Sequence, residues 1–381
     1  MNLALSDEQV FLREAARGTL ARFKTLEAAR EALDGNEGAL PDLWPTAIEA
    51  GWPGLLIDEA HGGAGLDAFD AMLVLGECGR VLAGVPLLGH LPASAILNDS
   101  PNTAAWLPMI ASGERRAAYL PCRPPDDLGD RWSTDPAGGL QRADLPTAGG
   151  ADGDGRVLLN GSFAFVPDAP GAAGMVGVAL QDGQPIGIAV LSESPGVEVA
   201  PVTRYDATRA LGHVTFTDSP AVVLDAPVQS LAAAWHLAQA LIAAESLGSV
   251  ETALETTVAY AKERHTFGRA IGSYQAVKHA LTEVLRQLEN GRSLLYYAGW
   301  ARHGAPDEFP LAANSARSVA GRALDQAART MISVHGGIGA TWEHDAPLYF
   351  RRAQLSRRLL GGTAAATDRV AGELIAQADA A

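Results

Sequence analysis

Two glycine-containing stretches in the C-terminal half of the chain combine residue types that bind anionic ligands. The first covers residues 264–279 and reads RHTFGRAIGSYQAVKH. It follows a long helical pattern, breaks at Gly268 and Gly272, and resumes as a helix at Ser273. Arginine and threonine beside a helix start suit an anion, because the first amides of a helix lack internal partners and carry the positive end of its dipole. Taken alone, the stretch is better explained as a surface loop with ordinary caps.

The second stretch covers residues 333–345 and reads SVHGGIGATWEHD. Its three glycines allow the backbone to approach a bulky ligand closely. The spacing is not GxGxxG and no strand pattern precedes it, which argues against a Rossmann dinucleotide loop or a P-loop. His335, His344 and Asp345 have no further residues that complete a consistent ligand set, so no metal site is predicted. Alone, this stretch is an ordinary glycine-rich helix end.

Three segments of the chain must position these stretches. Residues 1–115 show helical periodicity, with a capping box at Ser6 and Gln9. Residues 116–226 contain short β-type runs separated by Gly, Pro, Asp and Asn. Residues 227–381 return to long helical patterns. Helices, then a β unit, then helices is an α+β order and not an alternating βαβ order.

Composition limits the kinds of partner. The 381 residues are 48% hydrophobic and 19% charged, which is typical of globular proteins, and the net charge is −15. Such an acidic chain is a poor match for nucleic acid or an anionic membrane surface. Cys78 and Cys122 have no CxxC partner, and no apolar run approaches the roughly 20 residues that a membrane helix needs. We therefore expect a cytoplasmic protein without a disulfide framework or a membrane span.

Together the two stretches resemble the C-terminal signatures of the acyl-CoA dehydrogenase family. These signatures are an R-x-x-F-G-x-x-I-x-x-x-Q run and, further along, an H-G-G-x-G run, which match residues 264–275 and 335–339. The resemblance covers most of the chain, strongly in residues 240–355 and weakly in the β segment. It implies an α+β fold with three domains, namely an N-terminal helical domain, a middle β-barrel or β-sandwich domain and a C-terminal four-helix bundle, at residues 1–115, 116–226 and 227–381.

The resemblance implies FAD as the cofactor, held across a subunit interface. Arg264 and Thr266 match the residues that hold the flavin pyrophosphate of the neighbouring subunit, and Phe267 packs alongside them. Tyr274 and Gln275 fall near the dinucleotide.

The glycine turn of the second signature contacts the adenosine-diphosphate half of the flavin in this family. The matching residues here are Ser333, His335, Gly336 and Gly337. The family commonly has glutamine at the position of Ser333, so this chain departs from the pattern there.

The family reaction requires a carboxylate that removes the proton α to a thioester while hydride leaves the β carbon for the flavin. The two positions that usually carry it are Leu360 and Ala238 in this chain, and neither is acidic. Glu245, on a similar helix face further along and flanked by alanines and Leu247, is the candidate catalytic base. The alternative is that Glu245 pairs with an arginine of a neighbouring helix, and that alternative is favoured.

The β segment also departs from the family pattern beside the flavin ring. Where members carry a Thr/Ser-rich loop, this chain reads LPCRPP at residues 120–125. Where they carry a Trp-x-Thr strand, it has Phe165 and Pro167. Proline offers neither a hydroxyl nor an amide proton, so a hydrogen bond to the ring is lost. The arginines at 351, 352, 357 and 358, with Glu343-His344-Asp345, are interpreted most simply as a surface charge network. The alternative is that the arginines face the adenine-ribose phosphate of coenzyme A or a partner subunit.

Three functional hypotheses follow. The first is an FAD-dependent acyl-CoA dehydrogenase that acts alone or within a heteromer, takes an acyl-CoA thioester, and passes electrons to an electron-transfer flavoprotein. The second is a catalytically degenerate partner subunit that completes the FAD site of a second acyl-CoA dehydrogenase chain, as in bacterial steroid side-chain degradation. The third is a non-redox scaffold. Retention of the cross-subunit signatures together with loss of the ring-side residues slightly favours the second.

Overall fold

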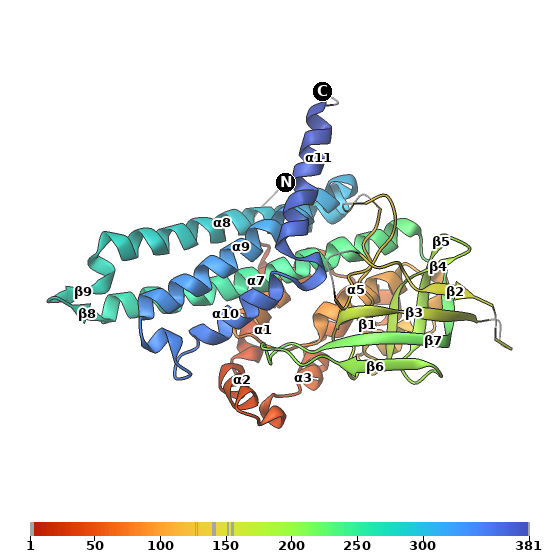
Figure 1. Ribbon diagram of the computed structural model, residues 1–381, viewed down its shortest axis with the longest axis horizontal. Coiled ribbons are helices and arrows are strands. Elements are labelled where there is room, and N and C mark those ends of the chain that lie inside the picture. The colour runs from red at the N-terminus through yellow and green to blue at the C-terminus, as the bar shows by residue number, and fades with distance from the viewer. Residues whose placement is uncertain are drawn as a thin grey trace.

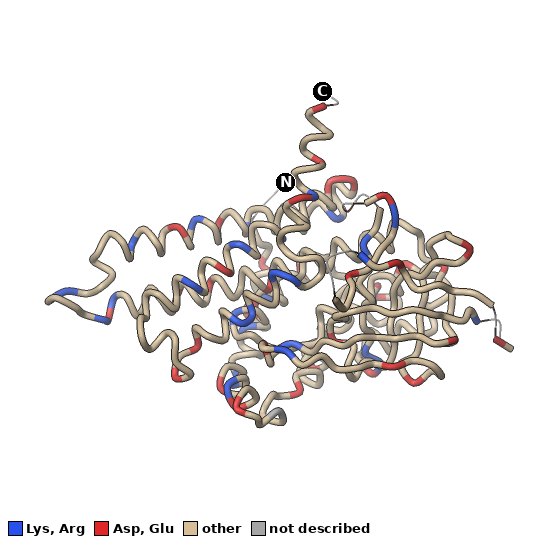
Figure 2. The backbone as a smooth tube through the Cα atoms, viewed as in Figure 1, with Lys and Arg blue, Asp and Glu red and all other residues tan. Residues whose placement is uncertain are grey.

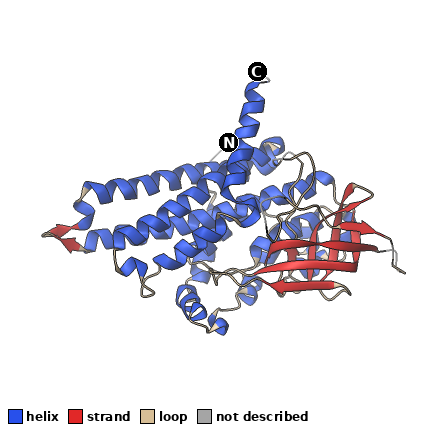
Figure 3. Cartoon of the chain, in the orientation of Figure 1, coloured by secondary structure: helices blue, strands red, loops and turns tan. Residues whose placement is uncertain are grey.

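Helices come first and last along the chain, and strands lie between them (Figures 1 and 3). The computed structural model describes residues 4–125, 127, 129–138, 142–150, 152–153 and 156–379. This order confirms the predicted α+β class. No helix in these described residues is long and apolar enough to cross a lipid bilayer.

The N-terminal part begins at the predicted capping box. The Ser6 hydroxyl accepts a hydrogen bond from the Gln9 amide at 3.2 Å, and the Gln9 side chain accepts one from the Ser6 amide at 3.1 Å. The helices of this part are α1 (Asp7–Leu20), α2 (Thr25–Leu33), α3 (Trp44–Glu49), α4 (Ala68–Arg80), α5 (Leu87–Asn98) and α6 (Leu107–Ala111).

The middle part is a β-barrel. Its strands are β1 (Ala117–Tyr119), β2 (Thr147–Gly149), β3 (Val157–Pro167), β4 (Gly174–Gln181), β5 (Gln184–Leu191), β6 (Val197–Pro201) and β7 (Leu211–Leu224). The pairings β4–β2–β3–β7–β5 close on themselves because β5 also pairs with β4. Closure removes the unpaired edges that an open sheet would leave. β1 adds to β4 in parallel, and β6 pairs with β7.

The C-terminal part consists of long helices. They are α7 (Val228–Glu263), α8 (Gln275–Gly304), α9 (Phe309–His335), α10 (Ala346–Ser356) and α11 (Gly362–Asp379). α7 packs against α8 and α9 and also against α4 of the N-terminal part. Glycines allow the last contact, since a Cβ on Gly79 would lie 1.9 Å from the Glu245 carbonyl oxygen. This close crossing fixes Glu245 at the junction of the three parts.

Candidate functional site

The first signature forms a hairpin at one end of the molecule, beyond the tips of α7 and α8 (Figure 1). Strand β8 (His265–Thr266) pairs with β9 (Arg269–Ala270), and Thr266 lies opposite Arg269. The two turn residues, Phe267 and Gly268, have φ values of 52° and 79°. Positive φ at both turn positions is the type I′ geometry that closes two-residue hairpins. The sequence predicted a loop here and a helix start at Ser273, whereas α8 begins at Gln275.

The side chains of the hairpin are largely open to solvent. Phe267 is 94% exposed, and Arg264, Thr266 and Gln275 are also exposed. Arg264 has no ion-pair partner in the described part of the chain, so its charge is available to a ligand. Figure 2 shows this basic end of an otherwise acidic molecule.

Tyr274 has a supporting position beneath the hairpin. Its hydroxyl donates to the Thr266 carbonyl oxygen at 3.2 Å. The guanidinium of Arg269 lies 4.0 Å from the centre of its ring, a cation–π contact. These contacts fix the angle at which the hairpin leaves α8.

The second signature ends α9. Ser333, Gly336 and Gly337 are not buried, and Gly336 has φ 65°, which favours glycine. A Cβ on Gly336 or Gly337 would meet nothing within 4 Å, so this turn faces open space. A larger molecule can therefore approach its backbone.

His335 points into the protein instead of outward. It is 4% exposed, its Nδ1 lies 2.7 Å from the Met331 carbonyl oxygen, and its ring stacks on Tyr260 at 4.2 Å between centres. Because Tyr260 lies one turn before Arg264, this stack holds the hairpin and the glycine turn at the same end of the bundle.

The donors at this end suit a pyrophosphate. A guanidinium forms charge-assisted hydrogen bonds with phosphate oxygens, and the Thr266 hydroxyl adds a neutral donor. The described residues here therefore fit the outer, diphosphate half of a flavin dinucleotide.

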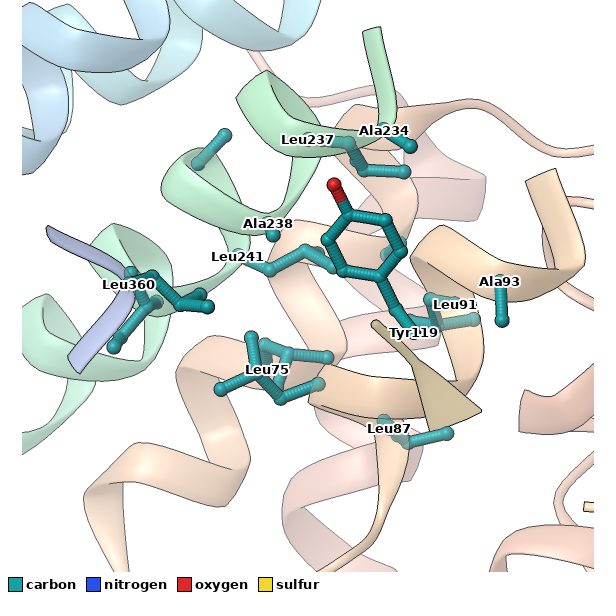
Figure 4. Close-up of a cluster of buried hydrophobic side chains, with 14 of the residues drawn as sticks. Leu75, Leu87, Leu91, Ala93, Tyr119, Ala234, Leu237, Ala238, Leu241 and Leu360 are labelled. Atoms are coloured by element: carbon teal, nitrogen blue, oxygen red, sulfur yellow. The ribbon is translucent and has the colours of Figure 1, made fainter. Parts of the chain in front are cut away.

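The positions that usually carry the catalytic base lie in a different environment, at the junction of the three parts. Ala238 is 0% exposed and Leu360 is 4% exposed. Figure 4 shows both in one apolar cluster drawn from α4, α5, β1 and α7. Tyr119, 1% exposed, stands among the leucines of this cluster. Side chains fill the region around both positions.

Polar contacts hold the turn that contains Leu360 in place. Gln239 on α7 donates to the Leu360 carbonyl oxygen at 2.9 Å, and Arg317 on α9 donates to the Leu359 carbonyl oxygen at 3.2 Å. Burial lowers the pKa of Arg317 to about 10. The Gly361 amide donates to Asp135 at 2.9 Å, and Asp135 pairs with Arg123 at 2.6 Å. This turn is therefore bonded to both the helical bundle and the β-domain.

The end of β3 offers no side-chain donor to a flavin ring. Phe165 has φ 53°, and its ring packs edge-on against His213 at 4.8 Å. Pro167 follows, and Asp168 accepts a hydrogen bond from the Gly89 amide of α5 at 2.9 Å. The described residues at this position fit the inner half of a flavin less well than the hairpin fits the outer half.

Glu245 forms a buried ion network. It is 3% exposed, and it pairs with Arg209 and, at 2.7 Å, with Arg352 of α10. Arg352 also pairs with Asp206 at 2.6 Å. Two carboxylates thus balance two guanidiniums, and both oxygens of Glu245 accept hydrogen bonds. The pair between Glu245 and Arg352 of α10 is the ion pair with a neighbouring helix that the sequence analysis favoured. The role of Glu245 as a catalytic base therefore has no direct support from the structure.

The interpretation of the C-terminal arginines needs one correction. Arg352 is 1% exposed and belongs to the buried network, not to a surface charge network. The burial of Arg352 could have been predicted from helical spacing. Arg352 lies three residues after the buried Tyr349 and four before the buried Ser356, so all three share one face of α10. Its partner Asp206 comes from a loop of the β-domain, as does Arg209, and neither carried a comparable signal.

Comparison with known proteins agrees with this architecture. The model of the N-terminal domain of acyl-CoA dehydrogenase matches residues 6–114, and that of the C-terminal domain matches residues 231–375. Acyl-CoA dehydrogenase IpdE2 of Mycobacterium tuberculosis is 31% identical over 93% of this chain and 93% of its own length. Acyl-CoA dehydrogenase FadE34 of the same organism is 31% identical over 95% of this chain and 47% of its own length.

Solved structures have the same fold. A chain of a variant of the Tcur3481-Tcur3483 steroid ACAD superposes with a TM-score of 0.84 at 30% identity, and the match covers 98% of this chain and 99% of that one. A chain of the ChsE4-ChsE5 complex from Mycobacterium tuberculosis superposes with a TM-score of 0.85 at 25% identity, with the same coverage. The two signatures, the closed β-domain between helical parts and these likenesses lead to one conclusion: the chain belongs to the acyl-CoA dehydrogenase family.

Proposed function

We propose that this chain is the non-catalytic subunit of a heteromeric acyl-CoA dehydrogenase, and that its hairpin and glycine turn complete the FAD site of the neighbouring chain. The observation that carries the proposal is the contrast between its two half-sites. The exposed half presents Arg264 without an ionic partner among the described residues, whereas both usual base positions are apolar and buried.

The exposed half supports a role in a neighbour's site. The β8–β9 hairpin lies at the end of the bundle (Figure 1), and Arg264, Thr266 and the Gly336-Gly337 turn are exposed to solvent. In such an assembly Arg264 and Thr266 would bind the diphosphate, and Phe267 would pack against the neighbour. A bound flavin supplies hydride acceptance, and this chain would contribute binding and orientation only.

The junction argues against chemistry on this chain itself. Neither Ala238 nor Leu360 can take up a proton, and Glu245 has both oxygens bonded to guanidiniums. Removing the partners of Glu245 to free it would leave buried charges unpaired, which costs several kcal/mol. We therefore assign proton abstraction from the acyl-CoA thioester, and electron delivery to an electron-transfer flavoprotein, to the partner chain.

The relatives support an assembly of two different chains. Two of the similar structures carry paired names, Tcur3481-Tcur3483 and the ChsE4-ChsE5 complex. A heteromer with one complete and one incomplete flavin site accounts for both observations. The hairpin of this chain would bind the flavin of the other chain, whereas the ring-side residues of this chain would have no flavin to bind.

Flavin content tests the proposal. The chain purified alone should show no flavin absorbance, and after co-expression with a flavin-binding acyl-CoA dehydrogenase chain the complex should contain flavin that an acyl-CoA bleaches. A lone chain that holds stoichiometric flavin and is bleached by acyl-CoA would instead establish the first hypothesis, an active dehydrogenase.

A matched pair of variants identifies the contact. Arg264→Gln in this chain should lower flavin retention by the complex at least about tenfold, because a charge-assisted contact to phosphate contributes about 1.5–3 kcal/mol. Arg286→Gln removes an exposed arginine of α8 that pairs with its helix neighbour Glu283, and should leave retention unchanged. Equal retention in both variants would refute the role of Arg264.

A further inference from the structure

A cavity of about 390 Å³ lies between the N-terminal helices and the outside of the β-barrel. Its roof comes from α5 and α6, through Leu97, Trp106 and Met109. Its floor crosses neighbouring strands in the order β1, β4, β5 and β7. The strands that form its floor lie at the opposite end of the molecule from the β8–β9 hairpin (Figure 1).

The floor is apolar where a solvent-facing sheet would be polar. Along β5, Ile188 and Val190 are buried, and the intervening Ala189 and Leu191 are more exposed. Leu191 is 52% exposed and lines the cavity together with Val222 of β7. The outer face of a barrel in water normally alternates to polar residues at these positions. Helices α5 and α6 cover part of this face, and an apolar surface that stays exposed beside them, as at Leu191, is typical of a ligand-binding surface.

Charge distinguishes this cavity from the rest of the protein. Arg115 and Arg116 line it beside β1, whereas Glu193 is the acidic residue in its described lining. Arg156 also lines it, beside β3, but pairs with Asp152 at 2.7 Å. The chain as a whole has a net charge of −15. Arg116 is held by the Pro170 carbonyl oxygen, but Arg115 is exposed and has no ion-pair partner in the described residues.

We infer that this cavity binds an elongated apolar molecule with a terminal carboxylate. Strands lie about 4.8 Å apart, so a ligand that crosses from β1 to β7 spans about 14 Å of apolar floor. Its carboxylate would pair with the guanidinium of Arg115 at the β1 end. The volume falls within the range of about 300–1,000 Å³ that is usual for small-molecule sites.

Dodecanoate is a suitable probe. Titrated into the full-length chain below its critical micelle concentration, it should bind saturably by isothermal titration calorimetry. Dodecyltrimethylammonium, with the same chain and the opposite charge, should bind at least about tenfold more weakly, because Arg115 and Arg116 repel it. Equal affinity of the two amphiphiles, or no saturable binding of dodecanoate, would overturn the inference.

Three variants locate the binding. Ala189→Trp should abolish binding by filling the space above β5. Arg115→Gln should weaken dodecanoate binding about threefold to tenfold and should leave the binding of dodecanol unchanged. Arg286→Gln on α8 removes a surface arginine outside the cavity and should bind like the unsubstituted chain. Unchanged binding in Ala189→Trp, with thermal unfolding showing that the variant is folded, would place dodecanoate elsewhere and refute the site.

Discussion

The hairpin end and the domain junction of this protein differ in how their polar groups are satisfied. At the hairpin end Arg264 has no ionic partner in the described structure and Phe267 is 94% exposed. At the junction, two arginines and two carboxylates pair with one another at less than 6% exposure each. Under the proposed function, a chain with one half of a family site open and the other closed is suited to act in a larger assembly.

The junction network should give the largest effect on stability. Arg352→Met leaves Glu245 with one cation and Asp206 with none in the described residues, so the free energy of unfolding should fall by about 3–5 kcal/mol. Denaturant unfolding measures it. Arg358→Met, which removes an exposed arginine six residues further along, should cost less than about 0.5 kcal/mol. An equal fall in the free energy of unfolding for Arg352→Met and Arg358→Met would show that the buried ion pairs do not stabilise the junction.

Acid should lower the stability of the contact between α5 and β1, where His90 is buried. Burial lowers the pKa of His90 to about 4, and its ring links the Pro53 carbonyl oxygen with the Ala117 amide. The unfolded chain has an ordinary histidine pKa near 6.5, so the stabilisation is complete above that pH and is lost as pH falls from 6.5 towards 4. The loss attributable to His90 between pH 7 and pH 5 should be about 2 kcal/mol.

The His90 contribution is measured as a difference between two proteins. Burial raises the pKa of Asp168 and Asp127, which acts in the opposite direction on acidification. His90→Gln should be less stable than the unsubstituted chain at pH 7, and the gap should narrow by about 2 kcal/mol at pH 5. A gap that does not change with pH would mean that His90 is not held neutral by its surroundings.

Two glycines of the second signature, Gly339 and Gly337, allow an effect on stability to be distinguished from an effect on flavin binding. A Cβ on Gly339 would lie 2.7 Å from the Ile332 carbonyl oxygen, so Gly339→Ala should cost about 1–3 kcal/mol of stability. Gly337 faces open space in a helical conformation, so Gly337→Ala should change stability by less than about 0.5 kcal/mol. In the heteromeric complex Gly337→Ala should nevertheless reduce flavin retention. Unaltered retention would remove the glycine turn from the proposed contact.

Phe267 should give a small effect of the opposite sign, a gain in stability of the isolated chain. Its φ of 52° is unfavourable for a large side chain, and asparagine tolerates that conformation better. Phe267→Asn should therefore stabilise the lone chain by up to about 1 kcal/mol in denaturant unfolding. The same change should weaken binding of the partner chain, since an exposed aromatic anchor is lost. Phe11→Asn, at another exposed phenylalanine, is the control and should leave partner binding unchanged.

Much of the fold and of the hairpin end could be predicted because their signals are local. Helical and strand periodicity marked the three parts, and Ser6 with Gln9 fixed the start of α1. Arg264 and Phe267 were named because residues 264–275 resemble a short family signature, and their part in flavin binding stays a prediction. The β-hairpin geometry was missed, since a two-residue turn with a phenylalanine at positive φ is not a usual turn sequence. His335 was expected at a ligand surface, and only packing against Tyr260 placed its ring inside.

The domain junction depended on tertiary structure. The sequence alone established that both usual base positions lack a carboxylate and that Pro167 cannot donate a hydrogen bond. It left two interpretations of Glu245 open, because its partners lie 36 residues before it and 107 residues after it in the chain. Only the packing of α4, α7 and α10 against the β-domain brings Arg209 and Arg352 to its two oxygens. Ion pairs between segments that are far apart in the chain leave no periodic pattern in the sequence, so only the tertiary structure could identify the partners of Glu245.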